Sequence, residues 1–167
     1  MDFGTRWAFF VAGRVPLQSP QHPDHVTWIT DQVAITNFFS AHNKEILAEN
    51  GIRAVLCLDR DLHGDSPAAR GIECLRLVHM IDGPNETVVF KEAVDALEEL
   101  ILEHGRVVVQ CRAGRSRSVA VTVAYLMKSL KMEASDALEA VMAKRPCSVA
   151  PELIRLVEEF DPGHDIP

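Results

Sequence analysis

The stretch Val107-Val108-Val109-Gln110-Cys111-Arg112-Ala113-Gly114-Arg115-Ser116-Arg117-Ser118 decides both the fold and the chemistry of this chain. Three consecutive β-branched residues predict a buried strand, and the small residues that follow predict a tight loop. The apolar run from Val119 to Leu130 predicts a buried helix after that loop. Amides between the carboxyl end of a strand and the amino end of a helix converge on one point, which favours a bound anion.

Two side chains of this loop suit phosphoryl transfer. Cys111 would lie beneath the anion as a nucleophile, and Arg117 would offer a planar fork to two of its oxygens. A thiol is mostly protonated at neutral pH, so the loop amides, the helix terminus and Arg117 would together have to stabilise the thiolate. The alternatives are an inert buried cysteine at a strand end and a solvated arginine at the start of a helix.

The remaining loop residues would surround the phosphate. Gly114 would supply a backbone conformation that side chains forbid. Arg112 and Arg115 either flank the mouth of the site, where they would favour a polyanionic substrate, or point to solvent. We predict that the substrate phosphate is bound by Arg112, Ala113, Gly114, Arg115, Ser116 and Arg117.

The composition is that of an ordinary globular protein. The 167 residues, 47% of them apolar and 25% charged, suit one domain with a sizeable core. The formal net charge of −7 argues against nonspecific binding to nucleic acid, and no stretch approaches the length of a membrane span. The apolar run from Trp7 to Gly13 is short and bracketed by arginines, so we expect no signal peptide and a cytoplasmic location. The four cysteines show no paired metal spacing and are expected to be reduced.

Strands and helices are predicted to alternate after an irregular lead-in over residues 1–25. Ser40 is predicted to cap a helix that ends at Asn50-Gly51, and the polar stretch from Asp59 to Arg70 is predicted to be a surface loop with one helical turn. This alternation predicts an α/β domain over residues 26–162, with a mainly parallel central sheet flanked by helices and its ligand site at the carboxyl ends of the strands. The other expected elements are strands at 26–29, 32–35, 53–58, 72–77 and 106–110 and helices at 87–103, 117–130, 133–144 and 151–160.

The chain resembles the cysteine-dependent phosphatases and, among them, the small dual-specificity phosphatases. The likeness runs from Trp28 to Phe160 and includes Tyr125-Leu126-Met127 and Arg145-Pro146 besides the loop. It implies a three-layer catalytic domain that hydrolyses phosphate monoesters, first of all in phosphorylated proteins, through a cysteinyl-phosphate intermediate without a metal or another cofactor. One departure is Gln110, where the family usually has histidine; glutamine can form hydrogen bonds but cannot carry charge.

The resemblance implies two further catalytic residues. Ser118 would donate a hydrogen bond to the sulfur when the thiolate leaves. Asp82 would protonate the leaving oxygen and later deprotonate the attacking water. Asp-Gly is also a turn pair in its own right, and Asp59, Asp61 and Asp65 follow another predicted strand and could reach the site.

Other functions stay open at this point. A phosphatase for phosphoinositides, or for another lipid or RNA phosphate, is favoured by Arg112 and Arg115. A phosphate-reading pseudophosphatase is supported only by Gln110. Sulfur transfer is disfavoured by Arg117-Ser118 at this offset, and a low-molecular-weight tyrosine phosphatase would carry the loop near its amino terminus. Cys57 either traps an oxidised nucleophile as a disulfide or is an inert core cysteine.

Overall fold

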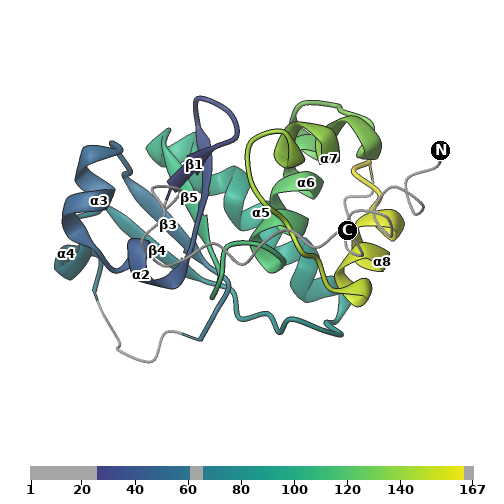
Figure 1. Ribbon diagram of the computed structural model, residues 1–167, viewed down its shortest axis with the longest axis horizontal. Coiled ribbons are helices and arrows are strands. Elements are labelled where there is room, and N and C mark those ends of the chain that lie inside the picture. The colour runs from purple at the N-terminus through teal and green to yellow at the C-terminus, as the bar shows by residue number, and fades with distance from the viewer. Residues whose placement is uncertain (1–25, 61–65, 164–167) are drawn as a thin grey trace.

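A central sheet lies between two groups of helices in the computed structural model, which describes residues 26–60 and 66–163 (Figure 1). The predicted irregular lead-in over residues 1–25 lies outside the described residues. The central strand of the sheet leads directly into the loop that begins at Cys111, so the fold is best followed from that strand outward.

The sheet has five strands in the order β1-β2-β5-β3-β4. β5 pairs in parallel with β2 and with β3, β3 pairs in parallel with β4, and only β1 and β2 are antiparallel. The predicted α/β class with a mainly parallel sheet is therefore confirmed. The strands are β1 (Val26–Trp28), β2 (Val33–Thr36), β3 (Ala54–Cys57), β4 (Cys74–Leu77) and β5 (Val107–Gln110).

Helices cover both faces of the sheet, with α3 and α4 on one side and α5 to α8 on the other (Figure 1). Alternate residues of β5 supply the two cores, because successive side chains of a strand point to opposite faces. Val107 and Val109 pack in the large cluster with α5 to α8, while Val108 packs in the smaller cluster with Leu47 of α3. The helices are α2 (Phe38–Ala41), α3 (Lys44–Glu49), α4 (Pro67–Arg70), α5 (Thr87–His104), α6 (Arg117–Ser129), α7 (Ala134–Met142) and α8 (Pro151–Glu159).

The predicted capping role of Ser40 is wrong. Two short helices, α2 and α3, replace the single helix, and each begins at an asparagine. The Asn37 side chain accepts a hydrogen bond from the Ser40 amide (2.9 Å), and the Asn43 side chain accepts from the Glu45 and Ile46 amides (3.0 and 3.1 Å). Asparagine caps as well as serine does, so the second asparagine starts a new helix where one continuous helix was expected.

The polar stretch after β3 contains the one helical turn that was predicted within it, α4, but its first and last residues are buried. Its last residue, Arg70, is buried, and its guanidinium contacts the His42 ring (2.8 Å) and the Ala41 carbonyl oxygen (3.5 Å). Its first residue, Asp59, is buried as well. Buried charges are retained where they are paired or hydrogen-bonded, and both residues have such partners.

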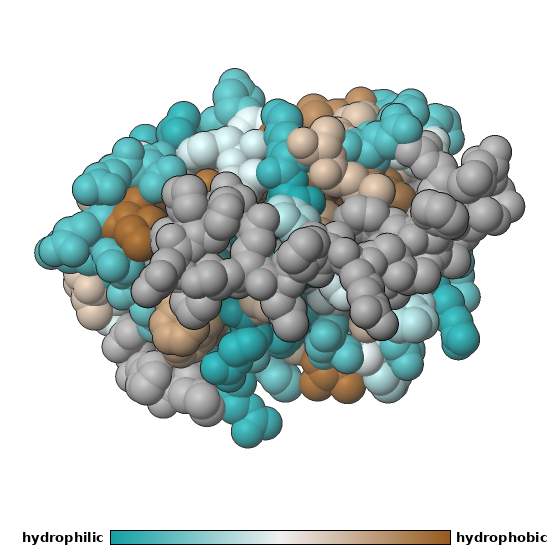
Figure 2. Space-filling model, viewed as in Figure 1, coloured by the Kyte–Doolittle hydropathy of each residue, from teal (hydrophilic) through white to brown (hydrophobic). Residues whose placement is uncertain are grey.

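The surface seen in Figure 2 is mostly hydrophilic, with apolar side chains scattered between the charged ones. Phe39, Leu102 and Val88 are among the large apolar residues that are exposed. Within residues 26–60 and 66–163, no helix is both long and apolar enough to cross a membrane.

Candidate active site

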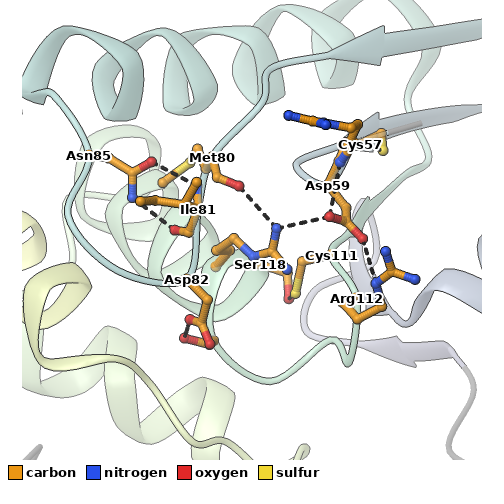
Figure 3. Close-up of polar contacts among 12 residues, drawn as sticks. Cys57, Asp59, Met80, Ile81, Asp82, Asn85, Cys111, Arg112 and Ser118 are labelled. Atoms are coloured by element: carbon orange, nitrogen blue, oxygen red, sulfur yellow. Dashed lines mark hydrogen bonds and ion pairs between the residues drawn. The ribbon is translucent and has the colours of Figure 1, made fainter. Parts of the chain in front are cut away.

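Residues 111–116, here called the cradle loop, connect β5 to α6 and form the base of the site (Figure 3). Gly114 has a φ of +67°, a left-handed conformation, and a Cβ atom there would lie 2.5 Å from the Thr36 carbonyl oxygen and also against Arg145. Only glycine can take this backbone and this close approach. The expectation of a special backbone at this position is therefore confirmed by the geometry.

Arg145, which belongs to the Arg145-Pro146 pair noted in the sequence, holds the cradle loop in place through a hydrogen bond to its backbone. It is buried, and its Nε donates to the Gly114 carbonyl oxygen (2.5 Å) while Nη1 donates to the Thr27 hydroxyl (2.8 Å). The Ser148 amide also donates to the Arg115 carbonyl oxygen (2.9 Å). The sequence indicated Arg145 only as part of the family resemblance and did not predict these contacts.

Cys111 is buried at the carboxyl end of the central strand, and its sulfur lies 3.2 Å from the Ser118 hydroxyl oxygen. Ser118 is fully buried in the first turn of α6. The amino end of this helix carries free N–H groups and a partial positive charge, both of which favour a thiolate or a phosphate at this position. The pairing predicted for these two side chains is thus available in the structure.

The Arg117 guanidinium lies beside the cradle loop and is held at Nη1 by two acceptors. Nη1 donates to the Asp59 carboxylate (3.2 Å) and to the Met80 carbonyl oxygen (3.0 Å), as Figure 3 shows. Nε is buried and has no hydrogen-bond partner among the residues that the structure describes. A buried donor without a partner is costly, so this edge of the fork is suited to an anion that supplies oxygens.

Asp82 reaches the cradle loop from the loop that precedes α5, residues 78–86, here called the acid loop. The Ser116 hydroxyl donates to an Asp82 carboxylate oxygen, and the Ala150 amide donates to that same hydroxyl (3.0 Å). Within the acid loop, the Asn85 side chain bonds the amide and the carbonyl of Ile81 (both 2.9 Å), which fixes the turn that carries Asp82. The acid loop is therefore tied to the cradle loop through one serine.

Of the other acids considered for proton transfer, the structure describes Asp59. Asp59 is buried between two arginines, and its carboxylate forms an ion pair with Arg112 Nε (2.9 Å) as well as with Arg117. Burial raises the pKa of Asp59. The hydrogen bond from the Arg60 amide and the charges of the two arginines together lower it by more, so the pKa of Asp59 lies below its ordinary value. Asp59 is thus a carboxylate at neutral pH without a proton to give, while Asp61 and Asp65 lie outside the described residues.

Arg112 lies over the aromatic ring of Phe38, with the guanidinium carbon 4.9 Å from the ring centre. The Phe38 amide donates to the Arg112 carbonyl oxygen (3.0 Å), which joins the start of α2 to the cradle loop. Residues 110–118 hold three arginines and no acid, yet two of the arginines share the single negative charge of Asp59. Asp59 lies 53 positions before Arg112 and 58 positions before Arg117, so no local sequence pattern could reveal these ion pairs.

Cys57 lies on the strand beside β5, as the disulfide hypothesis required, and pairs in register with Gln110. Alternation along β3 places its side chain on the face of Val55, whereas Cys111 packs in the cluster on the opposite face. Its thiol donates to the Asp59 carbonyl oxygen (3.2 Å). This arrangement favours the core role for Cys57 over a disulfide.

The comparisons with known proteins agree with this geometry. Residues 35–161 match the model of the dual specificity phosphatase catalytic domain. The chain belongs to the dual specificity phosphatase family. Its domain is that of a cysteine-based phosphatase, and the resemblance inferred from the cradle loop is confirmed.

Two relatives and one solved structure illustrate this dual specificity phosphatase domain. The chain is 36% identical over 107 residues to dual specificity protein phosphatase 1 of Arabidopsis thaliana, covering 64% of this chain and 54% of that protein. It is 31% identical to human dual specificity phosphatase 28 over 81% of this chain and 76% of that one. A crystal structure of human DUSP28 superposes with a TM-score of 0.71 at 24% identity, over 83% of this chain and 93% of that chain. The chain thus spans about half the length of the first of these relatives.

Gln110 is the departure from the family pattern at this dual specificity phosphatase site. It is fully buried, and neither atom of its side-chain amide has a hydrogen-bond partner among the described residues. Alternation along β5 points it to the face opposite Cys111. Among the same residues, no group of three or more histidine, cysteine, aspartate or glutamate side chains could hold a metal ion.

Because the described part of the chain offers the Gln110 amide no hydrogen-bond partner, Gln110→Met is expected to raise the free energy of unfolding by about 1 kcal/mol. Methionine keeps the volume and removes the cost of burying an unsatisfied amide. Urea denaturation of both proteins measures the difference. A loss of stability would mean instead that buried water satisfies the amide.

Ser116→Ala is expected to release Asp82 and to slow hydrolysis of a phosphotyrosine peptide by roughly tenfold to a hundredfold, the value of one hydrogen bond to a charged group. An activated aryl phosphate, whose leaving group hardly needs a proton, should be affected much less. Ser148→Ala is the matched control, because that side chain is exposed and its backbone contact to the cradle loop survives the change. Equal losses on both substrates would show that Ser116 supports the cradle loop and not the acid.

Proposed function

We propose that this domain hydrolyses phosphate monoesters of tyrosine and of serine or threonine in proteins through a cysteinyl-phosphate intermediate. The observation that carries the proposal is the open edge of Arg117, the residue that follows the cradle loop: its buried Nε has no hydrogen-bond partner within residues 26–60 and 66–163. Membership in the dual specificity phosphatase family supports the same reaction.

In the first step, the Cys111 thiolate attacks phosphorus and the bond to the substrate oxygen breaks. Asp82 in its protonated form gives that oxygen its proton, so that an alcohol or phenol leaves. The amides of the cradle loop and the open edge of Arg117 bind the equatorial oxygens, whose charge they stabilise in the transition state. The phosphoryl group is then bound to sulfur.

In the second step, water attacks the phosphorus of the intermediate and gives its proton to the Asp82 carboxylate. The sulfur–phosphorus bond breaks, and inorganic phosphate leaves. Ser118, whose hydroxyl lies 3.2 Å from the sulfur, donates a hydrogen bond to the departing thiolate. The enzyme returns to its starting state with a protonated Asp82 and a thiolate.

Protein substrates are favoured over polyanionic ones by the charge of the site. The argument for a lipid or RNA phosphate was that Arg112 and Arg115 add uncompensated positive charge at the mouth. Arg112 is instead paired with Asp59 at 2.9 Å and lies over the ring of Phe38, so it is already engaged by a carboxylate that it shares with Arg117. A single phosphate on a protein side chain needs no further cation than the cradle loop and Arg117 provide.

Turnover of four substrates in the presence of EDTA tests the proposal: an aryl phosphate, a phosphotyrosine peptide, a phosphothreonine peptide and a soluble phosphoinositide. We expect release of phosphate from the aryl phosphate and both peptides. Faster turnover of the phosphoinositide would favour the lipid phosphatase. Binding of the phosphopeptides without turnover would favour the phosphate-reading pseudophosphatase.

A further inference from the structure

Asp59, one of the acids that the sequence placed within reach of the site, forms ion pairs with Arg112 and Arg117 that the sequence did not indicate. It follows β3, and the neighbouring Leu58 amide donates to the Gln110 carbonyl oxygen (2.8 Å), which fixes the chain beside the end of β5. The Asp59 side chain is only 10% exposed. A carboxylate buried beside a phosphate site would repel the substrate unless neighbouring cations balanced its charge, and Arg112 and Arg117 are such cations.

Each oxygen of this carboxylate holds a different arginine (Figure 3). Oδ1 accepts from Arg117 Nη1 (3.2 Å) and from the Arg60 amide (2.9 Å), and Oδ2 forms the ion pair with Arg112 Nε (2.9 Å). The bond to the Arg60 amide fixes the rotation of the carboxyl group, so the position of Oδ1 is set by the backbone.

The contacts of Arg117 decide which way its fork faces. Asp59 and the Met80 carbonyl oxygen both bind Nη1, so two acceptors on one nitrogen define the direction of that edge. A guanidinium is planar, and fixing one nitrogen from two sides therefore orients the opposite edge, which carries the unpartnered Nε. The same carboxylate is ionised at neutral pH because its pKa lies below the ordinary value despite burial.

We propose that Asp59 is a positioning residue whose carboxylate orients the Arg117 guanidinium for the transition state without touching the phosphate. This inference rests on the proposed function, and it gives Asp59 a role other than that of the alternative proton donor. A proton donor would matter most for poor leaving groups. An orienting carboxylate matters equally for all of them, because Arg117 binds the transferring phosphoryl group and not the leaving group.

Asp59→Asn is expected to lower kcat by about tenfold to a hundredfold, equally on an aryl phosphate and on a phosphotyrosine peptide. Asparagine keeps one oxygen for Arg117 but presents an amide donor to the other arginine and removes the charge that holds both. The KM and the inhibition constant of inorganic phosphate should change by less than about threefold, because the cradle amides still bind the ground state.

Two variants make the test specific. Asp59→Glu keeps the charge and moves it by one methylene, so its kcat should lie between those of wild type and Asp59→Asn. Glu73→Gln is the matched control, since Glu73 also pairs with an arginine, Arg53 at 2.5 Å, but at an exposed place on the sheet away from the cradle loop. Its kcat should equal that of wild type.

The outcomes separate this inference from the proposed function. A wild-type protein that turns over none of the substrates overturns the proposed function. An active wild type with an unchanged kcat in Asp59→Asn, or with a loss confined to the peptide, overturns the role of Asp59. A parallel loss of phosphate inhibition would show a damaged cradle loop and would also overturn it. If Asp59→Asn does not fold, Asp59→Glu carries the test, with a loss of about threefold to tenfold expected on both substrates.

Discussion

Cys111→Ser is expected to abolish turnover, with kcat reduced by more than about 10⁴-fold on every substrate. A serine hydroxyl at this position stays protonated and is a far weaker nucleophile than a thiolate, so the first bond to phosphorus does not form at a useful rate. The cradle amides and Arg117 survive the change. Binding of a phosphotyrosine peptide should therefore persist or become tighter, because no thiolate remains to repel the phosphate.

Calorimetry with the peptide and a turnover assay measure both effects of the Cys111 change. Cys74→Ser is the matched control, since Cys74 is a partly exposed cysteine on β4. Cys147 is a poorer candidate for a nucleophile, because burial raises the pKa of its thiol to about 12. Appreciable turnover by Cys111→Ser would remove the covalent mechanism.

Asp82→Asn is expected to slow a phosphotyrosine peptide by about 10²–10⁴-fold, since the leaving phenolate would depart without a proton. An activated aryl phosphate has a stable leaving group, so its kcat/KM, which depends on the first step and not on hydrolysis of the intermediate, should fall by less than about tenfold. The ratio of the two losses is the measurement. Parallel kinetics on both substrates, at matched pH, give it directly.

Two results of the Asp82 experiment would contradict the assignment. Equal losses on the two substrates, or no loss on either, would move the proton transfer to another acid. Asp61 and Asp65 would then be the next residues to replace, because Asp59 is held ionised between two arginines.

The sequence predicted those parts of the molecule that depend on local pattern. The β-branched run before Cys111 predicted the central strand, the glycine predicted the left-handed turn, and the apolar run predicted the buried helix. Each of these depends on residues that are close together in the chain. The same local reasoning failed at Ser40, because two asparagines six residues apart are competing helix caps.

The contacts that complete the candidate site could not be predicted, because they join distant segments. Asp59 meets Arg117 only because β3 lies next to β5, and strand order is not visible in a single sequence. Arg145 reaches Gly114 from a segment 31 residues further along the chain. Its sequence neighbourhood gave no sign that a buried guanidinium would fasten the cradle loop.

Mass spectrometry of the wild-type protein, quenched with acid during turnover of a phosphotyrosine peptide, tests the central claim most directly. The account predicts a phosphate on the peptide that contains Cys111, absent from Cys111→Ser. In Asp82→Asn this phosphate should accumulate when the substrate is an activated aryl phosphate, because formation of the intermediate then hardly needs the acid while its hydrolysis still needs the base. Turnover without any phosphorylated enzyme, or a phosphate on a different residue, would contradict the account.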